Sequence, residues 1–236
     1  MNSPCEFLTW DSDFFGFRIA RVIADRLTLD SIAIIDSWAQ ANQIACLYFS
    51  ANASDSITIK LAEKSDYHLV DARLTFASAP LRDSTKSLRS SHPADLPALQ
   101  RIARESHRDT RFYFDENFPR ALCDTLYVTW ITRSCEGYAD AVLVADSEDQ
   151  VAGYVTCHIE KNGASGKIGL IAADQKFRRQ GVGRALVLGA LDWFARQNVV
   201  AVSVVTTARN VAAQHLYQSC GFTTVSFQLG YHKWYP

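Results

Sequence analysis

Two arginines and two glycines lie close together in the segment Arg178-Arg179-Gln180-Gly181-Val182-Gly183, and Arg184 follows it. The segment runs directly into a stretch with helical periodicity. The first turn of a helix leaves N–H groups unpaired and carries a partial positive charge, so it binds anions. Glycines at 181 and 183 allow a ligand to approach the backbone closely. This combination predicts a pyrophosphate site.

Two common phosphate-binding loops do not fit this segment. A P-loop needs GxxxxGK[ST], and no lysine or hydroxyl residue follows Gly183. A dinucleotide fingerprint needs GxGxxG, but Leu186 stands where the third glycine would be. On the loop alone, an ordinary strand-to-helix turn with surface arginines remains an alternative.

The elements around the loop are read from hydrophobic periodicity and turn residues. Three strands joined by short turns predict an antiparallel meander before the loop, over residues 141–145, 151–159 and 168–173. After it we expect a helix over 183–197, a buried parallel strand over 199–206, a helix over 211–219 and a closing hairpin. The hairpin is expected within 223–234, around Leu229-Gly230.

At this point the chain resembles the GNAT acetyltransferases. Arg178-x-x-Gly181-x-Gly183 matches the Q/R-x-x-G-x-G/A signature of that family, in the same place between a strand and a helix. A second family element follows at the usual distance, Asn210-x-x-Ala213-x-x-x-Tyr217-x-x-x-Gly221-Phe222. The resemblance covers residues 92–236. It implies a GNAT fold of the α/β (α+β) class, with a mixed, mostly antiparallel sheet, flanking helices and splayed central strands, and it implies acetyl-CoA as co-substrate.

The resemblance also assigns roles along the cofactor. Backbone groups of the strand before the loop would bind the thioester, Asn210 the cofactor arm, and Tyr217 would protonate the departing thiolate. Asn210 and Tyr217 are seven residues apart, nearly two helical turns, so both side chains lie on one helix face. The cofactor-binding set is then Ile171, Ala172, Ala173, Arg178, Arg179, Gln180, Gly181, Val182, Gly183, Arg184, Asn210 and Tyr217, with Tyr217 catalytic and no metal.

Two residues of the second meander strand are candidates for the group that removes the proton from the attacking amine. His158 and Glu160 are two residues apart on the second meander strand, so both are expected to point the same way. Either could instead be a solvated surface residue, and a water chain could carry the proton.

A looser resemblance extends over the rest of the chain. The opening Leu8-Thr9-Trp10-Asp11 and Phe14-Phe15-Gly16 resembles that of bacterial dTDP-fucosamine acetyltransferases, as does Thr110-Arg111-Phe112 with Tyr127 and Trp130 downstream. It implies a dTDP-linked 4-amino-4,6-dideoxy sugar as acceptor in surface polysaccharide synthesis, Arg111 and Phe112 as substrate-binding residues, and a homodimer. Other amines, such as a protein N-terminus, a polyamine or an aminoglycoside, remain alternatives. A non-catalytic CoA-binding module is a further alternative, but such a module would have no need of Tyr217 as an acid.

Composition limits the function classes further. The net charge is -1, which disfavours a nucleic-acid binder. Six scattered cysteines at no metal-ligand spacing predict buried free thiols in a reducing compartment. The sequence shows no signal peptide and no apolar stretch long enough to span a membrane, so we expect a cytoplasmic protein.

The first third of the chain carries no chemical motif. Leu29 to Gln43 reads as a helix and Ile44 to Phe49 as a buried strand. The serine-rich stretch 77–92 is the candidate linker, and it divides a small N-terminal α/β domain, residues 1–84, from the acetyltransferase domain, residues 85–236.

Overall fold

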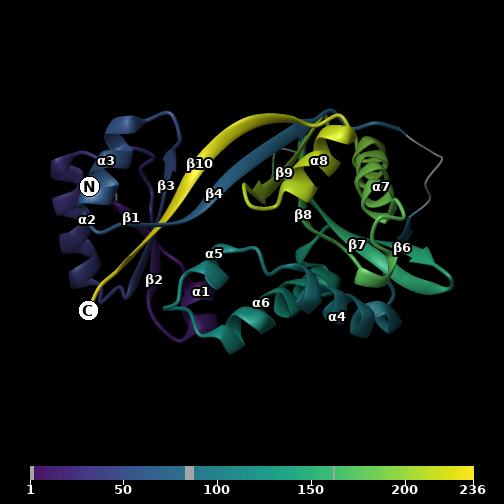
Figure 1. The fold of residues 1–236 in the computed structure, drawn as a ribbon, viewed down its shortest axis with the longest axis horizontal. Helices are drawn as coiled ribbons and strands as arrows, with labels where there is room; N and C mark the ends of the chain where they lie inside the picture. The colour runs from purple at the N-terminus through teal and green to yellow at the C-terminus, as the bar shows by residue number, and fades with distance from the viewer. Residues whose placement is uncertain (1–2, 83–87, 162) are drawn as a thin grey trace.

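The computed structural model of the chain describes residues 3–82, 88–161 and 163–236, and these form one ten-stranded sheet (Figure 1). The strands lie in the order β1-β2-β3-β10-β4-β9-β8-β7-β6-β5. Their bounds are β1 Cys5–Phe7, β2 Ile19–Val22, β3 Cys46–Asn52, β4 His68–Ser78, β5 Arg89–Ser90, β6 Ala141–Ser147, β7 Gln150–Ile159, β8 Ser165–Ala173, β9 Ala201–Thr207 and β10 Thr223–Trp234. Neighbouring strands are antiparallel except for β2 with β3 and β8 with β9. This mixed sheet confirms the predicted fold class.

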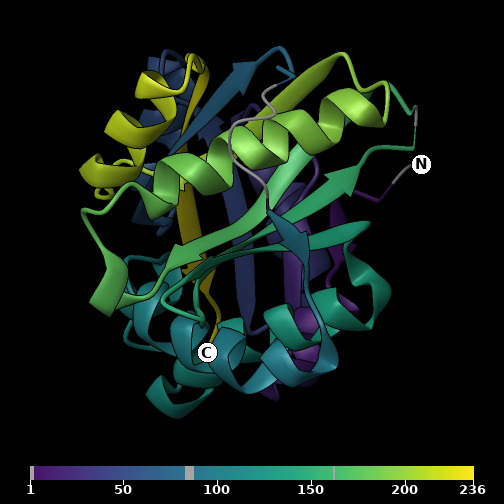
Figure 2. The ribbon, with the colours of Figure 1, turned by 90° about the vertical axis from the view of Figure 1, so that its right-hand side faces the viewer.

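Helices cover both faces of the sheet, as Figure 2 shows with α7 on one side and α4 on the other. Their bounds are α1 Thr9–Phe15, α2 Leu29–Ala41, α3 Ser56–Lys64, α4 Leu96–Ser106, α5 Arg111–Phe114, α6 Arg120–Arg133, α7 Val182–Arg196 and α8 Val211–Ser219. Short helical turns lie at Pro93–Asp95, Ser134–Tyr138 and Gln175–Phe177. Alternation along β7 separates the two layers: Val155 and Cys157 join the core under α7, whereas Tyr154 joins the core under α4.

Strands β6, β7 and β8 form the predicted antiparallel meander, and α7 and α8 follow within two residues of their predicted bounds. Strands β8 and β9 pair in parallel only from Ser165↔Ala201 to Ile168↔Val204. Strand β8 continues to Ala173 and β9 to Thr207, so beyond this point the two strands separate. The expected divergence of the central strands is therefore confirmed.

The predicted closing hairpin is wrong. Residues 223–234 form one continuous strand, β10, which pairs with β3 on one edge and with β4 on the other. Gly230 is not at a turn. It pairs with Ser50 of β3 and Asp71 of β4, in the middle of the strand. Two irregularities in the β10–β4 register, at Thr224/Ser226 and Gly230/Tyr231, bend the strand without ending it.

The predicted linker is only partly tested. Its first residues, 77 and 78, end β4, and Arg89–Ser90 form β5, which pairs with β6. These ends belong to the sheet rather than to a linker. The predicted domain boundary at residue 84 lies outside the described residues. The sheet is continuous across the two parts, because β4 pairs with β9 and β10 pairs with β3 (Figure 1).

All six cysteines are free, and five of them are buried. Cys135 is exposed, contrary to the expectation of buried thiols, because it lies in the short helical turn after α6 rather than in a packed strand. No helix among the described residues is long and apolar enough to cross a membrane.

Candidate active site

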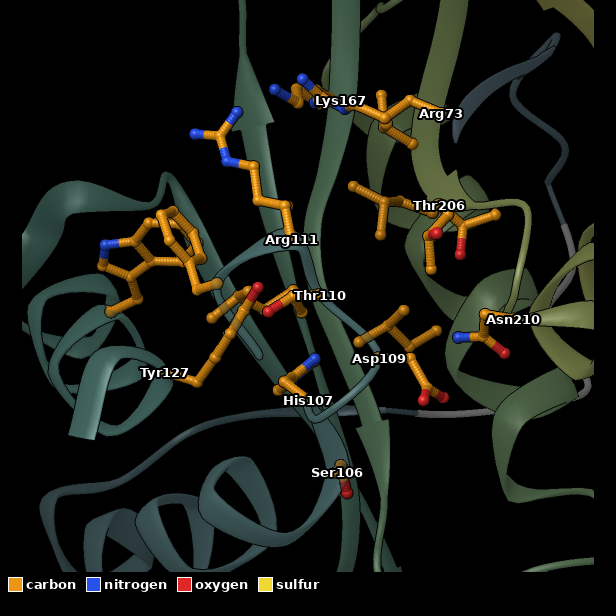
Figure 3. Close-up of a pocket in the computed structure, with 18 of the residues that line it drawn as sticks. Arg73, Ser106, His107, Asp109, Thr110, Arg111, Tyr127, Lys167, Thr206 and Asn210 are labelled. Atoms are coloured by element: carbon orange, nitrogen blue, oxygen red, sulfur yellow. The ribbon is translucent and has the colours of Figure 1, made fainter. Parts of the chain in front are cut away.

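A cavity of about 770 Å³ opens where β8 and β9 separate (Figure 3). Its walls come from both parts of the chain, with Trp10, Asp71 and Arg73 from the N-terminal third. The remaining lining includes residues of β8, β9, α6, α8 and the segment 106–112. Ligand sites in proteins are typically concave and of this size, so the cavity is the candidate active site.

The backbone of β8 offers hydrogen-bond donors to this gap. Leu170 N donates to Thr156 Oγ1 of β7 at 2.8 Å, and Asp174 N donates to Ala152 O at 2.9 Å. Successive N–H groups of a strand point to opposite sides. The N–H groups of Ile171 and Ala173 therefore point away from β7, toward the side where β9 no longer pairs. Ala172 points back to β7, so of the three predicted backbone residues only Ile171 and Ala173 can donate into the gap.

The loop before α7 has the geometry of an anion site. Gly181 is the N-cap of α7 with φ 84°, and no side chain caps the helix. A Cβ atom at Gly181 would meet nothing within 4 Å, so the first-turn N–H groups are accessible. Arg178, Arg179 and Arg184 are exposed beside them. None of residues 178–184 lines the cavity, but Arg178 Nη2 lies 3.5 Å from Ser106 Oγ, which does.

Gly183 has a different role from the one expected. A Cβ atom there would lie 3.1 Å from Leu216 Cδ2 of α8. The glycine thus allows α7 and α8 to pack closely, whereas the predicted close approach of a ligand fits Gly181 alone.

Asn210 and Tyr217 both line the cavity, as their spacing predicted. Asn210 Oδ1 accepts a hydrogen bond from Ala213 N at 3.0 Å and so caps α8. Its amide nitrogen points into the cavity (Figure 3). Tyr217 is only 3% exposed and packs against the rings of Phe76 and Phe222. Burial raises the pKa of Tyr217, so its hydroxyl keeps its proton at any ordinary pH.

Of the two candidate bases, the structure brings only His158 to the cavity. Glu160 is exposed, follows the last residue of β7 and does not line the cavity. His158 Nε2 lies 3.3 Å from Thr156 Oγ1, which already accepts from Leu170 N. The threonine hydroxyl can therefore donate to Nε2. Burial and nearby Lys167 lower the pKa of His158, which keeps the ring neutral and able to accept a proton.

Gly169 makes room for the His158 ring. A Cβ atom at Gly169 would lie 2.6 Å from His158 Nε2 and 2.8 Å from Thr156 Oγ1. The missing side chain lets the imidazole lie against the backbone of β8 just where β8 leaves β9. No pattern in the chain indicates this role, since the glycine and the histidine are on different strands.

The two predicted substrate-binding residues differ in exposure. The Arg111 guanidinium lies 4.2 Å above the Tyr48 ring and lines the cavity. Phe112 also borders the cavity but is buried in an aromatic core with Phe15 and Phe118, so packing occupies most of its surface.

Several cavity residues were not predicted from the sequence, notably Arg73, His107, Asp109 and Lys167. His107 stacks on Tyr127, and its Nε2 lies 3.1 Å from the Tyr154 hydroxyl. Burial lowers the pKa of His107 to about 4. Strand alternation could have indicated which face Arg73 and Lys167 occupy, but only the sheet order brings β4 and β8 to one cavity.

Comparison with known proteins agrees with this geometry. The model of the acetyltransferase (GNAT) family matches residues 98–222, more than half of the chain. A GCN5-related N-acetyltransferase from Sphaerobacter thermophilus has a similar fold, with a TM-score of 0.67 and 16% identity over 98% of this chain and 76% of that one. This likeness concerns the fold alone.

Two curated relatives match part of the chain. The spore coat polysaccharide biosynthesis protein SpsD of Bacillus subtilis is 25% identical over 60% of this chain, which spans only 48% of that protein. The [ribosomal protein bS18]-alanine N-acetyltransferase of Salmonella typhimurium is 28% identical over 58% of this chain and 81% of that protein. Since the family model covers the loop before α7, the separated strands and the helix with Tyr217, the chain belongs to the acetyltransferase (GNAT) family of enzymes.

Proposed function

We propose that this enzyme transfers the acetyl group of acetyl-CoA to the primary amine of a small molecule, a dTDP-linked 4-amino-4,6-dideoxy sugar. One observation carries the proposal. The cavity at the separated strands continues into the N-terminal third of the chain, where Trp10, Asp71 and Arg73 line it. An acceptor in this cavity would be enclosed by side chains from both parts of the protein, as suits a small molecule of defined shape.

The residues present fit acetyl-CoA. The accessible N–H groups at the start of α7 and the arginines beside them suit its pyrophosphate. The Asn210 amide nitrogen on the cavity suits the amides of its arm. When bound, acetyl-CoA supplies the activated acetyl thioester, and the chain must then carry out three tasks.

The first task is to stabilise charge on the carbonyl oxygen. The N–H groups of Ile171 and Ala173 point into the gap beside β8 and are fixed by the β7–β8 pairing, so they donate without reorganisation. The second task is to protonate the departing sulfur. Tyr217 lines the same cavity with its hydroxyl protonated, so it can donate the proton.

The third task is to remove the proton from the amine. We assign it to His158, which is neutral, lies on the cavity wall and is held by Thr156. The proton can reach Nε2 when the Thr156 hydroxyl, 3.3 Å away, rotates its hydrogen off this nitrogen. The exposed Glu160 lies off the cavity and is not needed.

A second candidate acceptor is the N-terminal alanine of a ribosomal protein, favoured by the 28% identity to the Salmonella relative. A third possibility is a CoA-binding module without catalysis. The buried Tyr217 on the cavity wall argues against it, because a module that only binds CoA needs no proton donor.

One experiment separates these three possibilities. The purified chain is incubated with acetyl-CoA and either the dTDP-amino sugar, an alanine-initiated peptide, spermidine or an aminoglycoside, and free thiol is measured. Thiol release with the nucleotide sugar alone supports the proposal. Release with the peptide alone, or with none, overturns it.

A further inference from the structure

Three cationic side chains meet at one end of the cavity. Arg73 comes from β4, Arg111 from the start of α5 and Lys167 from β8, so they are brought together only by the fold. In Figure 3 the Arg111 side chain extends toward Lys167 and Arg73, whereas Ser106 lies at the opposite end. All three line the same cavity, and neither Arg73 nor Lys167 belongs to the proposed acetyl-CoA site.

None of these cations is neutralised by an ion pair in the described part of the chain. The cavity also contains Asp11, Asp71 and Asp109, but no carboxylate oxygen of the described residues lies within 4.0 Å of the three cationic groups. Asp71 is occupied elsewhere: its Oδ1 accepts from Thr207 Oγ1 at 2.6 Å and lies 3.7 Å from Arg209. The cations are therefore available to a ligand.

Holding these cations together costs free energy in the absence of an anion. Burial and the nearby positive charge of Arg111 lower the pKa of Arg73, and the opposing effect of Asp71 does not restore it. Such repulsion between like charges in a partly buried site is retained where a ligand of opposite charge relieves it. A bound anion would neutralise both groups at once.

The position of Arg111 is set by a buried stack. Its guanidinium lies 4.2 Å above the Tyr48 ring, and that ring stacks on His232 with centroids 4.7 Å apart. His232 Nδ1 lies 2.6 Å from Asp115 Oδ2, which also accepts from Trp234 Nε1 at 2.9 Å. Tyr48 and His232 are 3% and 1% exposed. Because the platform is buried and hydrogen-bonded, Arg111 is pre-organised toward the cavity rather than free at the surface.

This cluster is separate from the loop expected to bind the pyrophosphate of CoA. Arg178 of that loop reaches Ser106, which lies at the other end of the cavity from Arg111 and Lys167. An anion held by the cluster would therefore belong to the second substrate. The planar, forked guanidinium groups match phosphoryl oxygens, and two or three cations suit a diphosphate better than a single carboxylate.

We propose that Arg73, Arg111 and Lys167 form an acceptor subsite for a phosphoryl group, so that the amine substrate is a phosphate or diphosphate ester. This inference rests on the proposed function, and it assigns the residues that would hold the phosphoryl groups of the acceptor. Trp10, Tyr127 and Trp130 line the same cavity and provide apolar ring surfaces beside the subsite. Polycationic acceptors such as polyamines and aminoglycosides are repelled from it.

The test measures binding rather than turnover, so that it reports even if no acceptor is acetylated. dTDP, inorganic pyrophosphate and thymidine are titrated into the full chain in saturating CoA, by calorimetry. We expect dTDP and pyrophosphate to bind, with affinity falling as salt rises. Arg73→Gln, Arg111→Gln and Lys167→Gln should each weaken dTDP binding about tenfold, while the affinity for CoA stays unchanged.

Matched controls lie outside the cavity. Arg26→Gln and Lys60→Gln remove exposed charges of the same kinds and should leave dTDP binding unchanged. Arg111→Lys keeps the charge but loses the planar stack on Tyr48, so an intermediate loss is expected. Thermal unfolding of each variant checks that the fold is intact, and Lys167→Gln, at an exposed position, provides the variant least disturbing to the core.

Each outcome decides the proposal. It is overturned if neither anion binds the wild-type protein, if saturating CoA abolishes binding, or if the cavity variants behave like the controls. If dTDP binds as described but no amine of the panel releases thiol, the subsite stands and the proposed function fails. If the nucleotide sugar is acetylated and the variants leave both dTDP affinity and the KM for the sugar unchanged, the function stands and the subsite fails.

Discussion

The two ends of the active site are built in different ways. At the cofactor end, one continuous segment, residues 178–184, follows the helical turn Gln175–Phe177 and leads into α7. Gly181 lies at the start of α7, where the first backbone N–H groups lie beside neighbouring arginines. At the acceptor end, β4, α5 and β8 each contribute one cation, and the aromatic platform under Arg111 comes from β3 and β10. In our proposal, a ligand common to a whole family would thus be bound by local backbone, whereas the ligand particular to this chain would be bound by side chains distant in sequence.

The largest effect is expected from Tyr217, which lies between the two ends. Tyr217→Phe removes the proton donor for the thiolate without changing the packing against Phe76, so kcat should fall about 100-fold or more. Acetyl-CoA affinity, measured by calorimetry, should stay within twofold. Tyr67→Phe, a buried tyrosine in the N-terminal core, is the control and should leave kcat unchanged. An unchanged turnover in Tyr217→Phe would exclude the acid role.

Two buried histidines, His107 on the cavity wall and His232 in the platform beneath Arg111, should make the stability of the protein pH-dependent. Burial lowers the pKa of His107 and of His232 to about 4, from an ordinary value of 6.5. Between these values the unfolded chain binds protons that the folded chain refuses, so the free energy of unfolding falls as pH drops from 6.5 toward 4. Each histidine should contribute roughly 3 kcal/mol. Below pH 4 the slope continues, because hydrogen bonds from His232 and Trp234 hold the pKa of Asp115 at about 2 despite its burial.

Urea unfolding at a series of pH values measures this slope. His107→Gln and His232→Gln should flatten it, since neither glutamine titrates. His215→Gln, at an exposed position on α8, serves as the control and should keep the wild-type slope. If the slope is the same in the wild type and the three variants, the pH dependence arises from groups other than His107 and His232.

A smaller effect is expected at His158. His158→Gln should lower kcat/KM about tenfold and remove the loss of activity on the acidic side, since a water molecule then takes the proton. Loss of activity below the lowered pKa of His158 has the sign expected for a base that must be unprotonated. Glu160→Gln, two residues along but exposed, should leave the pH–rate profile unaltered. An acidic limb that survives in both variants would favour a water chain.

The smallest effect separates the cofactor end from the acceptor end. Gly181→Ala places a side chain at φ 84°, which costs roughly 1–2 kcal/mol and displaces the first-turn N–H groups. The KM for acetyl-CoA should rise about fivefold while the KM for the amine stays constant. Gly163→Ala introduces similar strain, at φ 69°, in the β7–β8 turn and should lower stability without changing either KM. Equal rises in both KM values for Gly181→Ala would mean that the two ends are not independent.

The residues proposed for the cofactor end can be named from the sequence because their determinants are local. Glycine at a positive φ, arginines beside a helix start and the seven-residue spacing of Asn210 and Tyr217 are all readable within one or two elements. The acceptor end was predicted only in Arg111 and, in part, Phe112. Arg73 and Lys167 could not be found this way, because they meet through the strand order β4-β9-β8 and not through any spacing in the chain.

The error at β10 has the same origin. Leu229-Gly230 has the composition of a turn, but strand pairing on both edges holds the backbone extended there. Similarly, alternation along β7 predicted that Glu160 would follow His158, whereas the strand ends at Ile159. In both cases the tertiary environment outweighed a correct local pattern.

The central place of β10 also bears on how the protein is made. Strands β3 and β4 are synthesised first, yet each has β10, near the end of the chain, as its neighbour in the sheet. During translation the N-terminal strands therefore expose unpaired edges until β10 leaves the ribosome. Early termination would leave the sheet open between β3 and β4 and remove His232 and Trp234 from the platform beneath Arg111. A nascent chain that lacks β10 should thus be a substrate for chaperones rather than a weaker enzyme.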